Sequence, residues 1–276
     1  MRAIWISAGA VLMAGGASAE VTLERGAYLV EGPMGCGNCH TPLGATGEVA
    51  NQELSGRLVE ENPAFTAIAP NITPSGEVAA WSDAELARAI REGIRPDGSV
   101  IGPPMPIVLY RHLSDDDLMS VVMYLRQVPA IENDPGESVY NIPLPPAYGP
   151  PVESVASIPE GVTVEYGAYL AGPVAHCTEC HSPMGPQGPM SETHTGGGGM
   201  EFRGPGGTVV APAIHAAALA GYSDADLDSM IREGVRPDGE RMSPPMPYSH
   251  FALMTDDDLA AIILYLRQLP TPPAIE

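Results

Sequence analysis

Apolar residues recur at helical spacing in several separate segments of the chain. Ser82 and Glu85 form a capping box ahead of one such segment, and Gly93 follows it, which predicts a helix between these residues. Ser114 stands as a cap before the run 115–128, which has an acidic first turn and an apolar body. This pattern predicts another helix. A shorter helix is expected around 23–30. No convincing alternation of apolar and polar residues predicts a strand.

The helical pattern occurs twice, because the chain matches itself when it is shifted by 141 residues. Residues 82–98 match residues 223–239 at 12 of 17 positions. Helices are therefore also expected around 164–171, over 223–234 and over 255–269. A repeat of this length indicates a duplicated domain and not a short solenoid unit. We predict an all-α chain in which each half has three or four helices joined by long loops.

The ends of the repeats set the expected domain boundaries. Residues 1–19 carry an early Arg, a short apolar stretch and Ala-Ser-Ala at the end, the pattern of a secretory signal peptide; an uncleaved N-terminal anchor is the alternative. Between the repeats, residues 129–159 hold eight prolines, a composition typical of a stiff linker. We expect a signal peptide at 1–19, a first domain at 20–150 with the linker from about residue 129, and a second domain at 151–276. No later segment is apolar and long enough to span a bilayer, so the mature chain is expected to be exported without a transmembrane anchor.

The charge and composition of the chain exclude some classes of partner and suggest a cofactor. The 276 residues include 34 acidic and 13 basic ones, all of the latter Arg, and the formal charge is −21. That balance argues against nucleic acid or an anionic membrane surface as a partner. Gly (31) and Pro (30) are abundant, whereas Phe (3), Trp (2) and Tyr (10) are few. A loop-rich chain with few large rings suggests that a cofactor fills part of the interior.

Candidate chemistry is concentrated in the cysteines. All four lie in two copies of one motif, Cys36-Gly37-Asn38-Cys39-His40 and Cys177-Thr178-Glu179-Cys180-His181. Cys-x-x-Cys-His is the attachment signature of c-type haem, since the two thiols can reach two vinyl groups and the next His can bind the iron.

Disulfides, a zinc site and a thioredoxin-like pair are the alternatives to haem attachment. They fit less well, because tight pairs would cross-link little, zinc would need ligands from both halves, and no βαβ pattern is present. We predict two covalently bound haem c groups, with His40 and His181 as iron ligands.

Methionines are the expected second axial ligands. Met105 lies 65 residues after His40, and Met246 lies 65 residues after His181, both within Pro-Pro-Met-Pro. Flanking prolines fix the backbone, so this loop can hold a thioether against an iron, although methionine is also a common core filler. The other histidines lack partners at the 141-residue shift and are interpreted as surface or loop residues: His112, His176, His194, His215 and His250.

Further motifs extend the pattern beyond the cysteines. They are Pro70-Asn71-Ile72-Thr73-Pro74, Trp81-Ser82, the stretch 93–98 and Tyr124-Leu125-Arg126. With them, the whole chain after residue 19 resembles a tandem class I cytochrome c. It is especially similar to the cytochrome c subunits of periplasmic alcohol, gluconate and nicotinate dehydrogenases. The resemblance implies two such domains, each with a few helices wrapped around a covalently bound haem, in the periplasm.

The resemblance also implies particular roles. Helices near Tyr28 and Tyr124 are expected to cross, as are their counterparts near Tyr169 and Tyr265. Residues expected near the haem propionates are Asn71, Thr73 and Trp81, with Tyr222 in the place of Trp81 in the second half. The second half departs from the pattern, since Ala213-Ile214-His215 replaces Asn71-Ile72-Thr73.

These residues predict an electron carrier and not an enzyme. An iron held by His and Met has no vacant site for substrate or oxygen. We expect a periplasmic dihaem cytochrome that relays electrons one at a time from a dehydrogenase to a respiratory acceptor, either a terminal oxidase or another cytochrome. A free shuttle and a fixed component of a dehydrogenase are both open. The alternative is a haem enzyme, a dihaem peroxidase or a thiosulfate-oxidising cytochrome, with a displaceable sixth ligand. The acidity either favours a partner with a basic docking face or serves only solubility.

Overall fold

The fold is mostly helical. The computed structural model describes residues 20–45, 47–186, 188–204 and 207–275, so the predicted signal peptide at 1–19 lies outside the described residues. Helices hold 34% and strands hold 12% of the residues that the structure describes. Within the described ranges, no helix combines the length and the apolar character needed to cross a bilayer.

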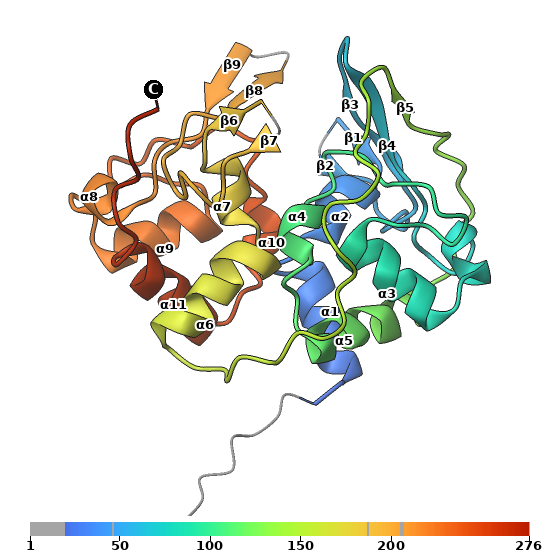
Figure 1. Cartoon of the computed structure of the whole chain (residues 1–276). Coiled ribbons are helices and arrows are strands. Elements are labelled where there is room, and N and C mark those ends of the chain that lie inside the picture. Colours follow the sequence, from blue (N-terminus) through green and yellow to red (C-terminus); the bar gives the residue numbers. More distant parts are fainter. Residues whose placement is uncertain (1–19, 46, 187, 205–206, 276) are drawn as a thin grey trace, which may run out of the picture.

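Helices and small sheets follow one another in the first half, coloured blue to green in Figure 1. Its elements are α1 (Leu23–Glu31), α2 (Cys36–His40), β1 (Leu43–Gly44), β2 (Gly47–Glu48), β3 (Arg57–Glu61), β4 (Phe65–Ala69), η1 (Glu77–Ala80), α3 (Asp83–Glu92), α4 (Ile107–Tyr110), α5 (Asp115–Leu125) and β5 (Val139–Tyr140). The capping box predicted for α3 is confirmed, because the Ser82 hydroxyl and the Glu85 carboxylate each accept a backbone N–H of the other residue. Ser114 caps α5 as predicted.

The second half, yellow to red in Figure 1, follows a similar order. Its elements are α6 (Val164–Tyr169), η2 (Leu170–Val174), α7 (Cys177–Cys180), β6 (Met184–Gly185), β7 (Gly188–Pro189), β8 (Glu201–Gly204), β9 (Gly207–Val210), α8 (Ala216–Leu219), α9 (Asp224–Arg232), α10 (Tyr248–Phe251) and α11 (Asp256–Leu266). The predicted helices at 223–234 and 255–269 are confirmed as α9 and α11, capped by Ser223 and Thr255.

Short antiparallel sheets were not predicted. In the first half β3, β4 and β5 form a three-stranded sheet, and in the second half β8 pairs with β9. The prediction of an all-α chain is therefore confirmed only in the predominance of helices. No residue of β3 is buried, so the strand has no apolar face and gives no alternating signal in the sequence.

Each half is built on one close helix crossing, as the resemblance implied. α1 packs on α5 and α6 packs on α11. The crossing points are glycines: a Cβ on Gly26 would lie 2.0 Å from the Ser120 carbonyl oxygen, and one on Gly167 would lie 2.0 Å from that of Ala261. Only glycine allows the two backbones to approach this closely.

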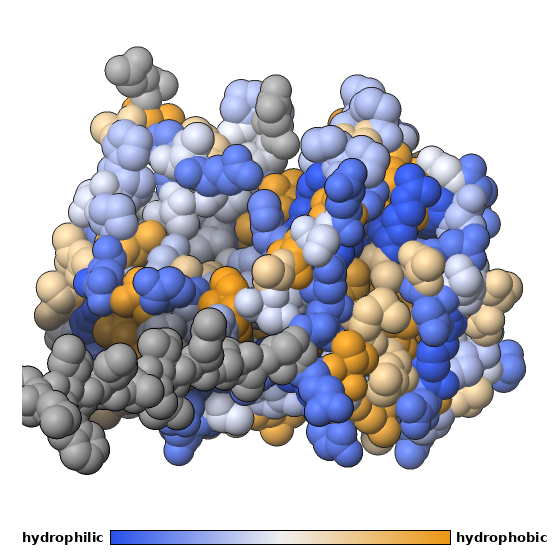
Figure 2. Space-filling view, turned by 60° about the horizontal axis from the view of Figure 1, so that its bottom comes forward, coloured by the Kyte–Doolittle hydropathy of each residue, from blue (hydrophilic) through white to orange (hydrophobic). Residues whose placement is uncertain are grey.

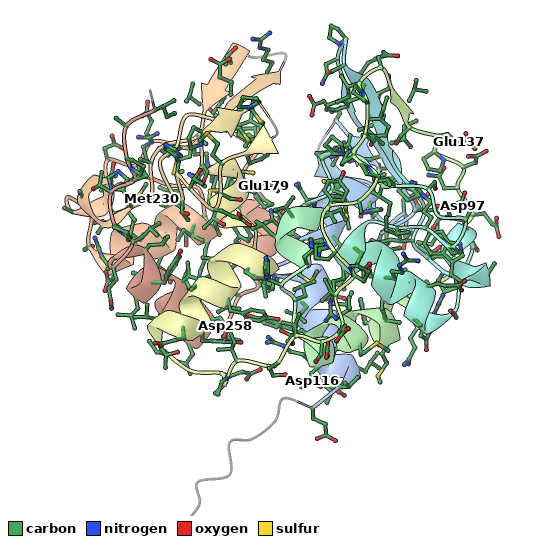
Figure 3. The ribbon with its side chains drawn as sticks, in the orientation of Figure 1. Asp97, Asp116, Glu137, Glu179, Met230 and Asp258 are labelled. Carbon is green, nitrogen blue, oxygen red and sulfur yellow. The ribbon has the colours of Figure 1, made fainter. Side chains whose placement is uncertain are left out.

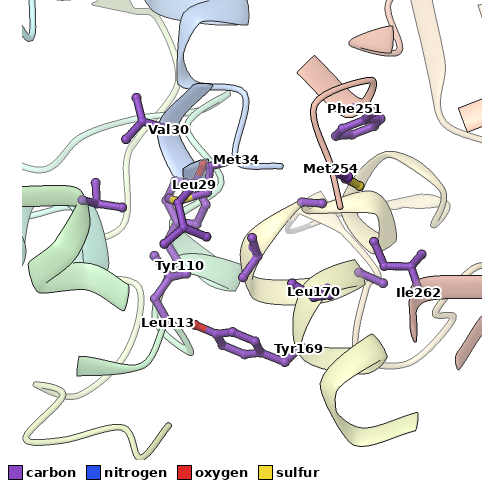
Figure 4. Packing of buried hydrophobic residues seen from close by; sticks show 14 of the residues in the cluster. Leu29, Val30, Met34, Tyr110, Leu113, Tyr169, Leu170, Phe251, Met254 and Ile262 are labelled. Atoms are coloured by element: carbon purple, nitrogen blue, oxygen red, sulfur yellow. The ribbon is translucent and has the colours of Figure 1, made fainter. Parts of the chain in front are cut away.

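The two halves share one apolar interior. The buried cluster runs from Leu29 and Tyr110 of the first half to Leu170 and Phe251 of the second (Figure 4). On the outside, the face turned forward in Figure 2 is mostly hydrophilic, with hydrophobic residues in small groups between the polar ones.

The boundary between the halves also holds a pair of equivalent polar contacts, in which the two halves exchange the donor and the acceptor. The Tyr28 hydroxyl donates to the Asp258 carboxylate at 2.5 Å, and the Tyr169 hydroxyl donates to the Asp117 carboxylate at 2.6 Å. Each residue of the second pair lies 141 positions from one of the first pair. Arg25 pairs with Asp117 of its own half at 2.7 Å and donates across the boundary to the Tyr166 hydroxyl at 3.3 Å. The boundary therefore has approximate two-fold symmetry.

Substitution of the crossing glycine tests the packing of α1 on α5. In Gly26→Ala the new methyl group would meet the Ser120 carbonyl oxygen, so the helices must move apart. We expect the free energy of unfolding to fall by about 1–3 kcal/mol, measured by denaturant unfolding of the full chain. Gly221→Ala is the matched control, because a Cβ there meets no atom within 4 Å. Equal stability of the two variants would contradict the crossing.

A second substitution tests the boundary between the halves. Burial, together with the Asp117 carboxylate, raises the pKa of Tyr169 above its usual range, so its phenol stays protonated and donates. Tyr169→Phe removes this buried hydrogen bond, and we expect a loss of about 1–3 kcal/mol in unfolding free energy. Tyr124→Phe is the control, since its hydroxyl contacts Glu31 at the surface of one half. A loss no greater than that of the control would show that the boundary does not depend on this contact.

Candidate functional site

The two cysteine motifs form short helices that begin in the same unusual backbone conformation. α2 follows Gly35 with a φ of 55°, and α7 follows His176 with a φ of 41°. The four thiols are free and half-buried. The disulfide alternative is therefore not formed here. Within the described part of the chain, no three His, Cys, Asp or Glu side chains gather as a metal-binding group, so these residues do not form the pooled zinc site either.

The two motif histidines are oriented in the same way. His40 Nδ1 lies 2.8 Å from the Pro70 carbonyl oxygen, and His181 Nδ1 lies 2.8 Å from that of Pro212. A carbonyl can only accept, so Nδ1 carries the proton and Nε2 keeps its lone pair. Burial lowers the pKa of both imidazoles, which keeps them neutral. Both are therefore in the state that an axial iron ligand requires.

The predicted methionine ligands occupy equivalent loops just before α4 and α10. The Met105 carbonyl accepts from the Ile107 N–H at 2.8 Å, and the Met246 carbonyl accepts from the Tyr248 N–H at 3.0 Å. Both side chains are half-buried and pack against the apolar interior. The thioethers thus lie on the inner side of these loops. Free thiols, a free Nε2 and an inward thioether in each half fit a covalently attached haem, and together they would supply its attachment points and both axial ligands.

Two of the residues expected near the propionates, Asn71 and Thr73, contact the linker. Asn71 is buried, and its side-chain N–H groups donate to the carbonyl oxygens of Ile131 and Asn133 in the linker at 2.8 and 3.2 Å. The Thr73 hydroxyl donates to the Asn71 side-chain oxygen at 2.7 Å. In the structure both residues therefore hold the linker against the first half.

The aromatic residues expected near the propionates take equivalent places. Trp81 and Tyr222 pack partly buried against the interior. The carbonyl oxygen of Trp81 accepts from Arg126, and that of Tyr222 accepts from Arg267, each at 2.5 Å. Tyr222 thus occupies the place of Trp81 in the repeat.

Two histidines that were interpreted as surface or loop residues lie at the boundary between the halves. His250 is only 7% exposed. Its Nδ1 lies 2.7 Å from the Glu31 carbonyl oxygen, and its Nε2 lies 3.0 Å from the Glu48 carboxylate. The surface interpretation is wrong for His250, because both ring nitrogens bind the first half. His176 Nε2 lies 3.3 Å from the Met34 carbonyl oxygen. The sequence held a signal for these contacts, because neither histidine has a counterpart in the other repeat. A residue that only one of two similar halves carries can serve a contact between the halves.

The second motif adds a half-buried carboxyl group at the same boundary. Glu179 lies on the side of α7 that faces the first half (Figure 3). Burial raises its pKa to about 7. Its carboxylate contributes to raised pKa values of Cys39 and Cys180, in which burial is the larger cause. The two motifs therefore lie near one another across the boundary.

A separate cavity of about 550 Å³ opens at the far end of this boundary. It is lined by Arg25, Tyr28, Glu160, Gly161, Thr255, Asp257 and Asp258. None of the predicted haem residues lines it.

Comparisons with known proteins give several relatives. The chain is 29% identical to the cytochrome c subunit of an alcohol dehydrogenase (quinone) from Gluconobacter oxydans, over 92% of this chain and 56% of that protein. It is 28% identical to a diheme cytochrome c-type protein from Cereibacter sphaeroides, over 86% of this chain and 82% of that protein. It is 27% identical to the cytochrome subunit of a fructose dehydrogenase from Gluconobacter japonicus, over 90% of this chain and 53% of that protein.

No family model matches the chain. The chain spans about half the length of the alcohol and fructose dehydrogenase subunits that it matches. The resemblance predicted from the sequence is confirmed: over most of its length, the chain is similar to cytochrome c subunits of dehydrogenases and to a diheme cytochrome c.

Proposed function

We propose that this chain is a dihaem electron-transfer cytochrome c made of two class I domains, residues 20–150 and 151–276. When bound, haem c supplies a one-electron couple at its iron. The observation that carries the proposal is the duplicated set of free thiols, a histidine with an available Nε2 and an inward methionine. Relatives named as cytochrome c subunits support it independently.

Each side chain has a specific role in this proposal. Cys36 and Cys39 attach one haem, and Cys177 and Cys180 attach the other. The carbonyl oxygens of Pro70 and Pro212 fix the tautomer and the ring orientation of the two motif histidines, which leaves Nε2 for the iron. Met105 and Met246 complete the two coordination spheres. With a histidine and a methionine as its ligands, neither iron would offer a position for substrate, so the chain would carry electrons without transforming a substrate.

The proposed setting is the periplasm, after export directed by residues 1–19. The donor is a dehydrogenase, and the acceptor is a terminal oxidase or another cytochrome. Several of the matched relatives are themselves subunits of dehydrogenases. This favours a role as the electron-transfer subunit of such a complex over that of a free shuttle.

Spectroscopy of the full chain, produced with haem attachment, tests the ligands. We expect two haems per chain and a near-infrared thioether-to-ferric-iron band that accounts for both. Met105→Ala and Met246→Ala should each remove about half of this band. Met119→Ala is the control, because Met119 packs against the interior from α5 and has Ala260 as its counterpart. A band that both ligand variants leave intact, or high-spin iron in the unaltered chain, would contradict the proposal.

The acidity predicts the charge of a favourable partner. With a formal charge of −21, the chain should associate faster with a basic redox protein, and salt should screen that attraction. We expect the bimolecular rate of electron transfer to a lysine-rich cytochrome c to fall about tenfold between about 10 and about 500 mM salt. Stopped-flow absorbance measures this rate, and an uncharged small-molecule oxidant is the control. A rate independent of salt would show that the acidity serves only solubility.

A further inference from the structure

One positive charge distinguishes the first motif from the second. Arg57 begins β3 and follows Gly56, whose N–H donates to the His40 carbonyl oxygen at 2.6 Å. In the second half the Gly198 N–H donates to the His181 carbonyl oxygen at 2.7 Å. The next residue there is Gly199. Arg57 therefore has no charged counterpart at the equivalent position beside the second motif.

The Arg57 guanidinium is held directly against the first motif. Its Nη2 donates to the Asn38 carbonyl oxygen, between the two cysteines, at 2.7 Å. Its Nη1 donates to the Leu58 carbonyl oxygen at 2.8 Å. The cation therefore lies directly against the backbone of the motif.

Among the described residues, no carboxylate pairs with this charge. None of their ion pairs includes Arg57, and its Nε is buried without a hydrogen-bond partner among them. The Nε atoms of Arg91 and Arg232 are likewise buried without a hydrogen-bond partner in that part of the chain. Each of these, however, pairs through another nitrogen with an acidic residue, Asp115 or Asp256, at 2.7 and 2.9 Å.

The linker encloses the first half more than the second. Asn133 donates to the Ser55 carbonyl oxygen at 2.9 Å, beside Arg57. The hydroxyls of Tyr140 and Tyr148 donate to the carbonyl oxygens of Pro103 and Ile101, both at 2.8 Å, and so brace the loop that leads to Met105.

The two motif histidines also differ in solvent exposure, with the first half again the more enclosed. His40 is 7% exposed, whereas His181 is half-buried. Electrostatic effects are stronger where water is excluded. The field of Arg57 therefore acts in the less solvated of the two sites.

We propose that Arg57 makes the first-half haem the site of higher reduction potential, so that electrons enter at the second half and leave from the first. This rests on the proposed function, because it requires a haem in each half. A fixed positive charge stabilises the reduced form, which carries one more negative charge than the oxidised form. Enclosure acts in the same direction, since burial disfavours the more highly charged oxidised iron.

Spectroelectrochemical titration of the full chain tests the assignment. We expect two resolved potentials, and we expect Arg57→Gln to lower the higher one and leave the lower one nearly unchanged. The equilibrium constant for moving an electron from the second half to the first should fall about tenfold, which is about 59 mV for a one-electron couple. Arg57→Lys keeps the charge and should restore most of the shift. Arg203→Gln is the control for net charge, because Arg203 is exposed on β8, and it should move neither potential appreciably.

Each result has a distinct meaning. A fall in the lower potential, an equal fall in both, or no change in Arg57→Gln would overturn the assignment. So would an Arg57→Lys variant that shifts as far as Arg57→Gln, because the hydrogen bond to Asn38 and not the charge would then be responsible. Haem content is measured first. Fewer than two haems per chain would overturn the proposed function itself, whereas two haems with a wrong pattern of potentials would overturn only the role of Arg57.

Discussion

The buried contact between the halves holds both motif helices beside one another. Tyr28 and Tyr169 each donate to a carboxylate of the opposite half at 2.5 and 2.6 Å. His250 binds the end of α1 and Glu48 with its two ring nitrogens. These groups are largely removed from water. Leaving one of them without its hydrogen-bond partner would therefore cost more free energy than the hydrogen bond itself contributes. The relative position of the halves is therefore narrowly determined, and so is the position of the motifs.

A fixed arrangement of this kind suits electron transfer better than substrate chemistry. An electron carrier needs ligands that stay in place when the charge of the iron changes. Here the two motif histidines are held by backbone carbonyls at 2.8 Å. The loop before Met105 is braced by two tyrosines from the linker. The contacts that stabilise the fold are in this way also the contacts that would limit movement at the proposed ligands.

The two halves are symmetric where they meet and asymmetric around the motifs. Repeated residues supply the tyrosine–aspartate pairs, whereas Arg57, Glu179 and the linker contacts occur once. Asn71 illustrates the difference, because it holds the linker through Ile131 and Asn133 while Ala213 stands in its place. A duplicated chain can thus keep one fold and still place each motif in a different electrostatic environment.

Local physical chemistry determined what could be predicted from the sequence. The repeat, the capped helices at Ser82, Ser114, Ser223 and Thr255, and the cysteine motifs all depend on neighbours close in the chain, so their patterns are visible without a structure. The resemblance built on those motifs is confirmed as well.

The strand β3 was not predictable, because neither of its faces is buried and it leaves no periodic signal. The contacts of His250, Asn71 and Arg57 were decided only by tertiary structure, since each binds a residue distant from it in the chain. Contacts over such distances depend on how the halves and the linker pack, and no spacing along the chain encodes them.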